Sequence, residues 1–314
     1  MKISELIKET ALIGKGRGKS SVFSKKFGSI LLYNQMATVQ KLGTSVTVSM
    51  MISGVTDKIN VAGKKEPVAY HKVSLAINNI KQEYYTPEEL VNTLRKNHTE
   101  FADTDKWNSN DILHAAIEAP QKYFPGSTLF RATNDENNGY CVVSNKIPED
   151  AEIQVWCSCS DYYWTMQFYN CERDVDLYKT YPQRYIPKTQ KGFEAFKSGQ
   201  PLRNPGRHPG MCKHLMLLLA TLMEKGVIED KGSNLKRYYK ANYSNFDMRK
   251  RRLSMSEYEN VIKEYDRDHE KQLDQRNVAH YTSYGAGGHN AGWGYKWDPK
   301  TGQFKRSHGK RRKQ

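Results

Sequence analysis

The first half of the chain switches between helical and strand-like spacing of its apolar residues. Residues 1–13 place Ile3, Leu6 and Ile7 among charged neighbours at a spacing that predicts a short amphipathic helix. Residues 30–53 and 68–77 instead carry apolar side chains at alternate positions. Because side chains alternate between the two faces of a strand, this pattern predicts a β-hairpin or small antiparallel sheet with one buried face.

The segment Thr86-Pro87-Glu88-Glu89 has the composition of a helix start. The threonine hydroxyl can accept a hydrogen bond from the amide three residues on, the glutamate there can bond back, and proline suits the first helical position. We therefore expect a helix from this point and a second helix over residues 111–119.

The second half of the chain shows the same mixture of patterns. Strands are predicted over residues 127–133, 139–145 and 152–157, and the apolar run Leu215–Met223 predicts a helix that Gly226 ends. Near the C-terminus, Ser254-x-x-Glu257 provides a second capping box. The pattern indicates an α+β fold of small antiparallel sheets with packed helices.

Two short motifs carry the recognisable chemistry, Cys157-Ser-Cys159 and Cys212-Lys-His214. Residues i and i+2 of a strand point to the same side, so the first two thiols can reach one point. A Pro-Gly turn places the second motif on the first turn of the following helix, where the helix dipole favours a thiolate. Three thiols and an imidazole that converge in this way predict a tetrahedral zinc site with no position open for substrate.

Other readings of these cysteines are weaker. A disulfide framework would leave one of the five cysteines unpaired, since Cys141 and Cys171 complete the set. A Cys/His nucleophile is disfavoured because four candidate ligands crowd together and no second catalytic constellation accompanies them. For each motif alone, an inert buried thiol or a core histidine is the alternative. We assign Cys141 to core packing and expect a structural metal.

The order Cys-x-Cys, gap, Cys-x-His resembles the SWIM zinc-finger family over about residues 140–226. The preceding hairpin, Asp161 with the aromatic residues after it, and the apolar helix after the second motif extend the resemblance. It implies a zinc-stapled ββα module. The gap of 52 residues, 160–211, is much longer than the family usually carries. The segments Asp-Tyr-Tyr-Trp and Pro-Gly-Met-Cys-Lys-His-Leu also resemble SWIM-bearing proteins of large bacterial viruses, which implies a virion component.

The long gap admits two interpretations. Its tyrosines at positions 178, 181 and 185 are interleaved with arginines and lysines, a composition that can stack bases and hold phosphates. The alternative is a loop anchored on the core by its tyrosines. Because the cost of closing a loop grows slowly with its length, we expect residues 172–208 to be replaceable by a Gly/Ser linker without loss of zinc.

The net charge of +15 lies at the two ends of the chain. Residues 1–30 hold seven Lys or Arg against two acids, residues 235–314 hold 19 against nine, and residues 31–234 hold 23 of each. This distribution indicates a balanced body with basic extensions for an anionic partner, nucleic acid or neighbouring protein subunits. The residues expected to contact that partner are Lys15, Arg17, Lys19, Arg249, Lys250, Arg251, Arg252, Lys310, Arg311, Arg312 and Lys313.

These features divide the chain into five parts. They are a basic N-terminal arm (1–30), an α+β region (31–126), the zinc module with its insertion (127–232), a basic helical region (233–276) and a basic Gly-rich tail (277–314) whose composition predicts disorder in isolation. The segment Gly14–Ser21 is part of the arm and no phosphate-binding loop, since Ile13 stands where that motif needs glycine.

The function expected from the sequence is non-enzymatic. It is that of a zinc-stabilised binding or assembly protein, as in a virion or another large assembly. The alternative is a cytosolic DNA-binding regulator or recombination accessory protein that contacts DNA through the SWIM-like module. The chain shows no secretory signal and no apolar run of the length needed to span a bilayer, so we expect a reducing intracellular compartment.

Overall fold

The computed structural model describes most of the chain as two compact units, Met1–Val261 and Ile262–Gln314. The described residues are 1–13, 29–33, 38–42, 45–54, 69–133, 138–179, 204, 207–230, 250–269, 293–298 and 303–308. The α+β class predicted from the sequence is confirmed. The α+β region and the zinc module expected from the sequence share one unit and, as shown below, one sheet.

The helices include those that the apolar periodicity and the caps predicted, with small shifts at their ends, and short ones that the sequence did not predict. They are α1 (Ile3–Leu12), α2 (Pro87–Asn97), the 3-10 helix η3 (Thr99–Phe101), α3 (Ser109–Glu118), α4 (Pro120–Tyr123), α5 (Ser160–Thr165), α6 (Gln167–Glu172) and α8 (Lys213–Glu224), with a further helix over residues 255–269. The strands are β1 (Ser29–Tyr33), β2 (Thr38–Leu42), β3 (Ser45–Gly54), β4 (Ala69–Ile77), β5 (Gln82–Tyr85), β6 (Ser127–Thr133), β7 (Asn138–Ser144), β8 (Ile153–Cys157), β9 (Lys250–Arg252), β10 (Trp293–Asp298) and β11 (Gln303–His308).

Both predicted capping boxes are formed. The amide of Glu89 donates to the Thr86 hydroxyl at 3.2 Å, and the Thr86 amide donates to the Glu89 carboxylate at 2.8 Å. The Glu257 amide and the Ser254 hydroxyl are 3.3 Å apart, and the Ser254 amide donates to the Glu257 carboxylate at 2.8 Å. The local sequence therefore specifies where both helices begin.

Strands β1 to β9 form one nine-stranded sheet around β3. On one side of β3, β4 pairs antiparallel with it and pairs in turn with β8. On the other side of β3, two strands pair with it. Strand β2 pairs with the first half of β3 and β1 with the second half. From this fork β2 continues through a parallel pairing with β6 to β7 and β5, while β1 continues to a parallel partner, β9. The parallel pairing of β2 with β6 joins strands that the sequence suggested would form separate small sheets. The parallel partner of β1, β9, is a strand that the sequence did not predict.

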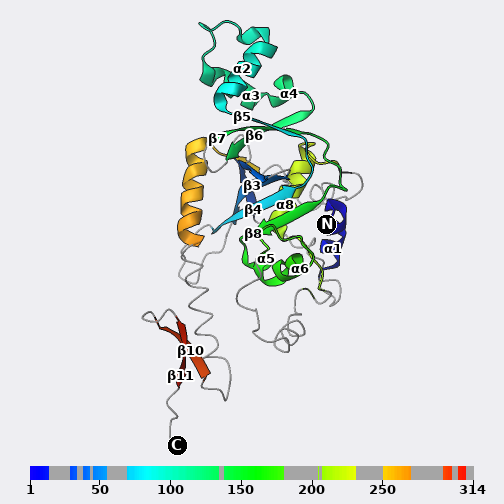
Figure 1. Ribbon diagram of the computed structural model, residues 1–314, viewed down its shortest axis with the longest axis vertical. Coiled ribbons are helices and arrows are strands. Elements are labelled where there is room, and N and C mark those ends of the chain that lie inside the picture. Colours follow the sequence, from blue (N-terminus) through cyan, green and yellow to red (C-terminus); the bar gives the residue numbers. More distant parts are fainter. Residues whose placement is uncertain are drawn as a thin grey trace, which may run out of the picture. The chain divides into compact units, whose positions relative to one another are not determined.

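The main core lies on one face of the β3–β4–β8 part of the sheet, beneath α8 (Figure 1). Alternate residues of β3, from Val46 to Ile52, belong to this core, as the period-two pattern predicted. Every residue from His214 to Met223 is buried, so α8 is apolar on all sides and lies fully inside the core. Helix α1 completes this layer with Ile3 and Leu6, which have no exposed surface. One face of residues 1–13 of the expected N-terminal arm is thus part of the core.

A second, smaller core lies between α2, η3, α3 and α4 and strands β6 and β7. Leu90 and Leu94 of α2 pack there around Phe101, whose ring meets those of Trp107 and Tyr123 at centroid distances of 5.1 and 5.2 Å. This helical group therefore has its own hydrophobic stabilisation and is joined to the sheet through β6 and β7.

The C-terminal unit contains the antiparallel hairpin β10–β11. The sequence predicted disorder over residues 277–314 in isolation, so the paired strands β10 and β11 are a departure from that expectation. Strand β10 alternates aromatic and other residues, with Trp293, Tyr295 and Trp297, which is a strand pattern that the glycine-rich composition around it masked. Among the helices in the described residues, none has the length and hydropathy needed to cross a membrane.

Candidate metal centre

The two cysteine motifs meet in one buried cluster. Cys157 ends β8, Cys159 is the residue before α5, Cys212 is the residue before α8, and His214 lies in the first turn of α8. Their candidate ligand atoms all lie within 4.8 Å of one another, and each residue is at most 2% exposed. The structure thus brings together the four residues that the sequence singled out, in a group that could hold a metal ion.

Main-chain amides point at two of the sulfur atoms. The amide of Cys159 donates to Sγ of Cys157 at 3.4 Å, and the amide of Tyr162 donates to Sγ of Cys159 at 3.3 Å. Sγ of Cys157 lies 3.7 Å from Nδ1 of His214. The ring of His214 also contacts the ring of His71 on β4, with centroids 4.7 Å apart. Amide donors directed at sulfur favour the thiolate form that a metal ligand requires.

The protein environment shifts the pKa values of the three cluster thiols in different directions. Burial raises the pKa of Cys157 and of Cys212 well above the ordinary thiol value, and the negative charge of Cys159 adds to this effect. Burial also acts to raise the pKa of Cys159. Hydrogen bonds with Cys157, Cys212 and His214 outweigh that effect, so the Cys159 pKa falls well below its usual value. Three thiolates at such short distances would repel one another in this dry site, and a bound divalent cation is the charge that would favour all three.

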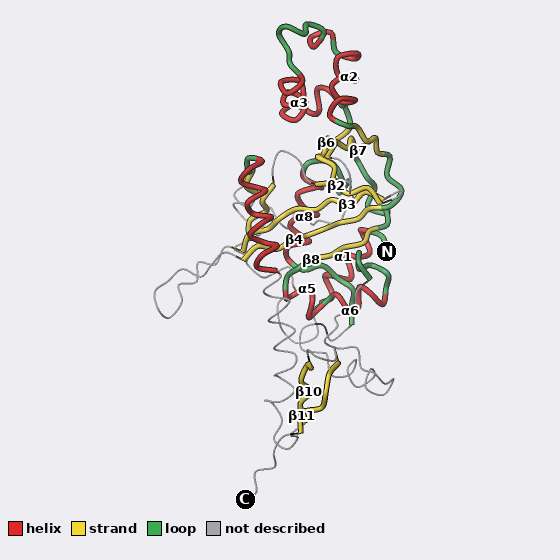
Figure 2. Tube along the Cα trace, turned by 60° about the vertical axis from the view of Figure 1, so that its left-hand side comes forward, coloured by secondary structure: helices red, strands yellow, loops and turns green. Residues whose placement is uncertain are grey.

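A buried polar network supports the first pair of candidate ligands, Cys157 and Cys159. The Tyr162 hydroxyl donates to Asp176 Oδ2 at 2.7 Å, lies 2.8 Å from the Val155 carbonyl, and receives a bond from Asn170 Nδ2 at 3.1 Å. Tyr162, Asn170 and Asp176 have no exposed surface. Figure 2 shows α5 and α6, which carry Tyr162 and Asn170, close to the end of β8. The network therefore fixes α5, and with it Cys159, against the strand that ends in Cys157.

The same network reaches the second ligand pair through Asn170. Its Nδ2 donates to the Gly210 carbonyl at 2.9 Å, and the Gly210 amide donates to its Oδ1 at 2.7 Å. Asn204 adds bonds to the carbonyls of Thr165 and His208, at 3.2 and 2.6 Å. The chain that returns to Cys212 is thus held by two buried amide side chains.

The contacts at both ends of residues 172–208 argue against the prediction that this segment is replaceable without loss of zinc. Val175 and Asp176 are fully buried, and the amide of Val155 on β8 donates to the Val175 carbonyl at 2.8 Å. Asn204 is only 3% exposed. Both ends of the proposed deletion therefore belong to the core. No pattern in the sequence indicates these contacts, because single buried Asn and Asp residues have no periodicity that could be recognised.

The described part of the tyrosine-rich stretch contacts the protein itself. The ring of Tyr178 is 49% exposed and meets Trp156 edge-on, with centroids 5.1 Å apart. Nζ of Lys179 lies 2.9 Å from Asp174 Oδ1. These contacts favour the interpretation of a loop anchored on the core. The tyrosines at 181 and 185 lie outside the described residues.

Of the basic residues expected to meet a partner, the structure describes those on β9. Arg251 and Arg252 are exposed on this strand, which ends the β1 branch of the sheet, and Lys250 begins it. Arg251 Nη2 lies 3.6 Å from Glu257 Oε1. The others, Lys15, Arg17, Lys19, Arg249, Lys310, Arg311, Arg312 and Lys313, lie outside the described residues.

Comparisons with known proteins provide no relative to set beside this site. No family model, no curated protein sequence and no solved structure matches the chain.

Proposed function

We propose that this protein is a non-enzymatic binding or assembly component, built around one structural zinc ion and carrying basic segments for an anionic partner. The observation that supports it most strongly is the buried Cys3His group. Its two halves lie at the end of β8 and at the start of α8, and 52 residues, 160–211, stand between Cys159 and Cys212 in the chain. Four donors of these types seldom converge in a core unless they share a ligand.

The donor set favours zinc among the common metal ions. Thiolate and imidazole are the ligands of tetrahedral structural zinc, whereas magnesium and calcium prefer oxygen. In this proposal Cys157, Cys159, Cys212 and His214 all bind the ion, as the resemblance to SWIM zinc fingers implies. The ion would supply the positive charge that the three buried thiolates require.

The burial of the cluster supports a structural rather than a catalytic role. A catalytic zinc keeps one coordination position open to water or substrate. Here four protein donors are available, and the most exposed of them has only 2% of its surface accessible. Zinc at this place would tie β8 to α8 within the main core.

The basic partner-binding role is supported by charge and by one exposed strand. The net charge of +15 arises from residues 1–30 and 235–314. Arg251 and Arg252 stand exposed on β9 within the second of these regions. Such residues would contact nucleic-acid phosphates or the acidic surface of a neighbouring subunit in a virion or other large assembly, within a reducing compartment.

Binding of unrelated DNA sequences over a range of salt concentrations tests the partner. If phosphates are the contacts, the logarithm of affinity falls by about 0.9 per contact for each tenfold rise in salt, without sequence preference. The double variant Arg251→Gln/Arg252→Gln should flatten this slope. Its matched control, Lys96→Gln/Lys106→Gln, removes two exposed charges from the electrically balanced part of the chain and should leave the slope unchanged.

The alternatives give different results in the same assays. A protein partner predicts little DNA affinity even at low salt, and co-sedimentation of the protein with a large particle in extracts of its native source. A strong, salt-insensitive and sequence-selective complex would contradict the assembly role and favour the DNA-binding regulator.

A further inference from the structure

Helix α1 is attached at its start to the segment that leads into β8. The amides of Ile3 and Ser4 donate to the carbonyls of Ala151 and Glu149, at 3.1 and 2.9 Å. The amide of Ile153, the first residue of β8, donates to the Met1 carbonyl at 2.9 Å. The N-terminal end of α1 is thus fixed to the base of the strand whose other end carries Cys157.

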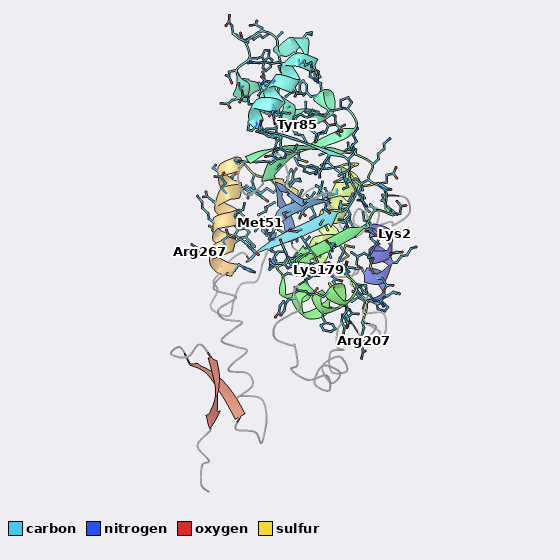
Figure 3. All side chains as sticks on the ribbon, in the orientation of Figure 1. Lys2, Met51, Tyr85, Lys179, Arg207 and Arg267 are labelled. Carbon is cyan, nitrogen blue, oxygen red and sulfur yellow. The ribbon has the colours of Figure 1, made fainter. Side chains whose placement is uncertain are left out.

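The other end of α1 holds the segment that leads into α8. Oγ1 of Thr10 accepts a hydrogen bond from the amide of Met211 at 3.0 Å, and Met211 directly precedes Cys212. Oε2 of Glu9 lies 2.6 Å from Nδ1 of His208. In Figure 3, Lys2 marks the start of α1 and Arg207 marks the start of this second segment.

Packing reinforces the contact at this second end. The side chain of Ile13 lies so close to Gly210 that a Cβ on the glycine would collide with Ile13 Cδ1. Thr10 has no exposed surface and Met211 none either. Thr10 Oγ1 also donates to the Leu6 carbonyl at 2.6 Å, which fixes its rotamer and directs the oxygen toward Met211. The hydrogen bond is therefore formed in a dry, closely packed setting.

From these two attachments we infer that α1 holds both segments in place and so sets the position of Cys212 and His214 relative to Cys157. Thr10 is the main positioning residue of this helix. Ligand geometry at a metal site is controlled by the groups that orient the ligands. Thr10 acts one peptide bond from Cys212, and Asn170 holds the adjacent Gly210 through both its amide atoms. The segment is thereby held from α1 and from α6. This inference rests on the proposed metal centre.

Thr10→Val is the direct test, because valine keeps the shape of threonine and removes the acceptor for the Met211 amide. Thr221→Val is the matched control. Thr221 is also buried and its hydroxyl also bonds the carbonyl four residues earlier, that of Leu217, but this bond lies within α8 and does not reach the segment that precedes Cys212. Thr10→Ser keeps the hydroxyl and should behave as wild type.

Zinc affinity of the full chain is measured by competition with a chromophoric chelator. We expect about a tenfold loss for Thr10→Val, the lower end of the effect of outer-sphere changes at metal sites, and little change for Thr221→Val. Equal affinities for Thr10→Val and Thr221→Val would overturn the inference. If Thr10→Val fails to fold, Glu9→Gln is compared with Glu5→Gln on the same helix, and a few-fold loss confined to Glu9→Gln is expected.

A second measurement separates this inference from the metal proposal. In metal-free protein, the rate at which a small alkylating reagent labels Cys212 is followed by mass spectrometry. Release of the Met211 amide should raise this rate in Thr10→Val relative to Thr221→Val. If the wild type binds no zinc but the labelling rate still rises in Thr10→Val, the positioning role of α1 is supported and the zinc proposal is contradicted. If the wild type binds zinc and Thr10→Val changes neither the zinc affinity nor the labelling rate of Cys212, the positioning role of α1 is refuted and the zinc proposal is unaffected.

Discussion

The Sγ atom of Cys157 lies 3.7 Å from Nδ1 of His214, although the two residues are 57 positions apart in the chain. The contact is made by β8 and α8, and both elements belong to the main core. Strand β8 is held by its pairing with β4 from Val73 to Ile77. The fold therefore delivers the ligands to one place, and the metal would add a cross-link to elements that already pack together.

Tyr162→Phe should destabilise the protein. The change removes the hydroxyl that donates to Asp176 and accepts from Asn170, and it leaves a fully buried carboxylate without that donor. Loss of one partner in a buried hydrogen bond costs about 1–3 kcal/mol, and more when the remaining group is charged. The loss of stability is measured as the difference in free energy of unfolding between wild type and variant, obtained by denaturant titration. The control is Tyr85→Phe, whose hydroxyl bonds the exposed Glu83, and a Tyr162→Phe protein as stable as this control would contradict the role of the network.

Replacement of residues 172–208 by a Gly/Ser linker should destabilise the protein and weaken zinc binding. The deletion removes Val175, Asp176 and Asn204, which pack or bond against β8 and the returning segment. Replacement of residues 181–200 alone retains all these contacts and should preserve zinc binding, since loop closure depends weakly on length. Zinc content and melting temperature of the two proteins decide the matter, and equal behaviour would contradict the assignment of both ends to the core.

Thr86→Ala should cost about 1 kcal/mol of stability without changing zinc affinity, because it removes the cap of α2 in the smaller core. Hydrogen bonds from the Thr86 amide and side chain lower the pKa of Glu89 in the folded protein. A carboxylate whose pKa is lowered in the folded state stabilises the fold at pH values above its unfolded-state pKa. This contribution is lost as the pH falls through the folded-state pKa. The difference between wild type and variant should therefore shrink below about pH 4.5. A difference in thermal unfolding that is absent at pH 7, or that grows in acid, would contradict this prediction.

Cys171 should react slowly with alkylating reagents at neutral pH, although it is only half-buried. Burial and the charge of Asp176 raise its pKa to about 12. A thiol with that pKa is roughly 0.01% thiolate at pH 8, against about a quarter for an unperturbed cysteine. Reactivity should increase with pH up to about pH 12, and unfolding should abolish the protection. Labelling of the folded protein at the rate of a free thiol would show that Asp176 and the surrounding core do not shield this sulfur.

Local signals in the sequence predicted much of the secondary structure. The alternation in β3 and β4 and the two capping boxes each depend on residues within a few positions of one another, so they can be recognised without the fold. The spacing of Cys157 with Cys159 and of Cys212 with His214 is local as well. Their convergence in one buried cluster follows from the elements that carry them, which the apolar patterns also indicated.

Long-range pairings could not be predicted in this way. The parallel partners β1 and β9 lie more than 200 residues apart in the chain, and β9 is a three-residue strand of basic residues with no apolar pattern. Thr10, Asn170 and Asp176 are single polar residues whose importance depends on partners brought close only by folding. The role of α1 beside the metal centre belongs to the same class, because its sequence shows an amphipathic helix and nothing of what it contacts.

Elemental analysis of the purified full-length chain tests the central claim most directly. We expect about one zinc per chain, and a large loss of zinc in Cys212→Ser, because the remaining ligands cannot complete a closed tetrahedral site. Cys141→Ser is the matched control, since Cys141 is equally buried but lies outside the cluster, and it should retain zinc. Chelation should lower the melting temperature of the wild type and leave that of Cys212→Ser unchanged. A wild-type protein without bound metal, or a Cys212→Ser variant with undiminished zinc, would contradict the proposed centre.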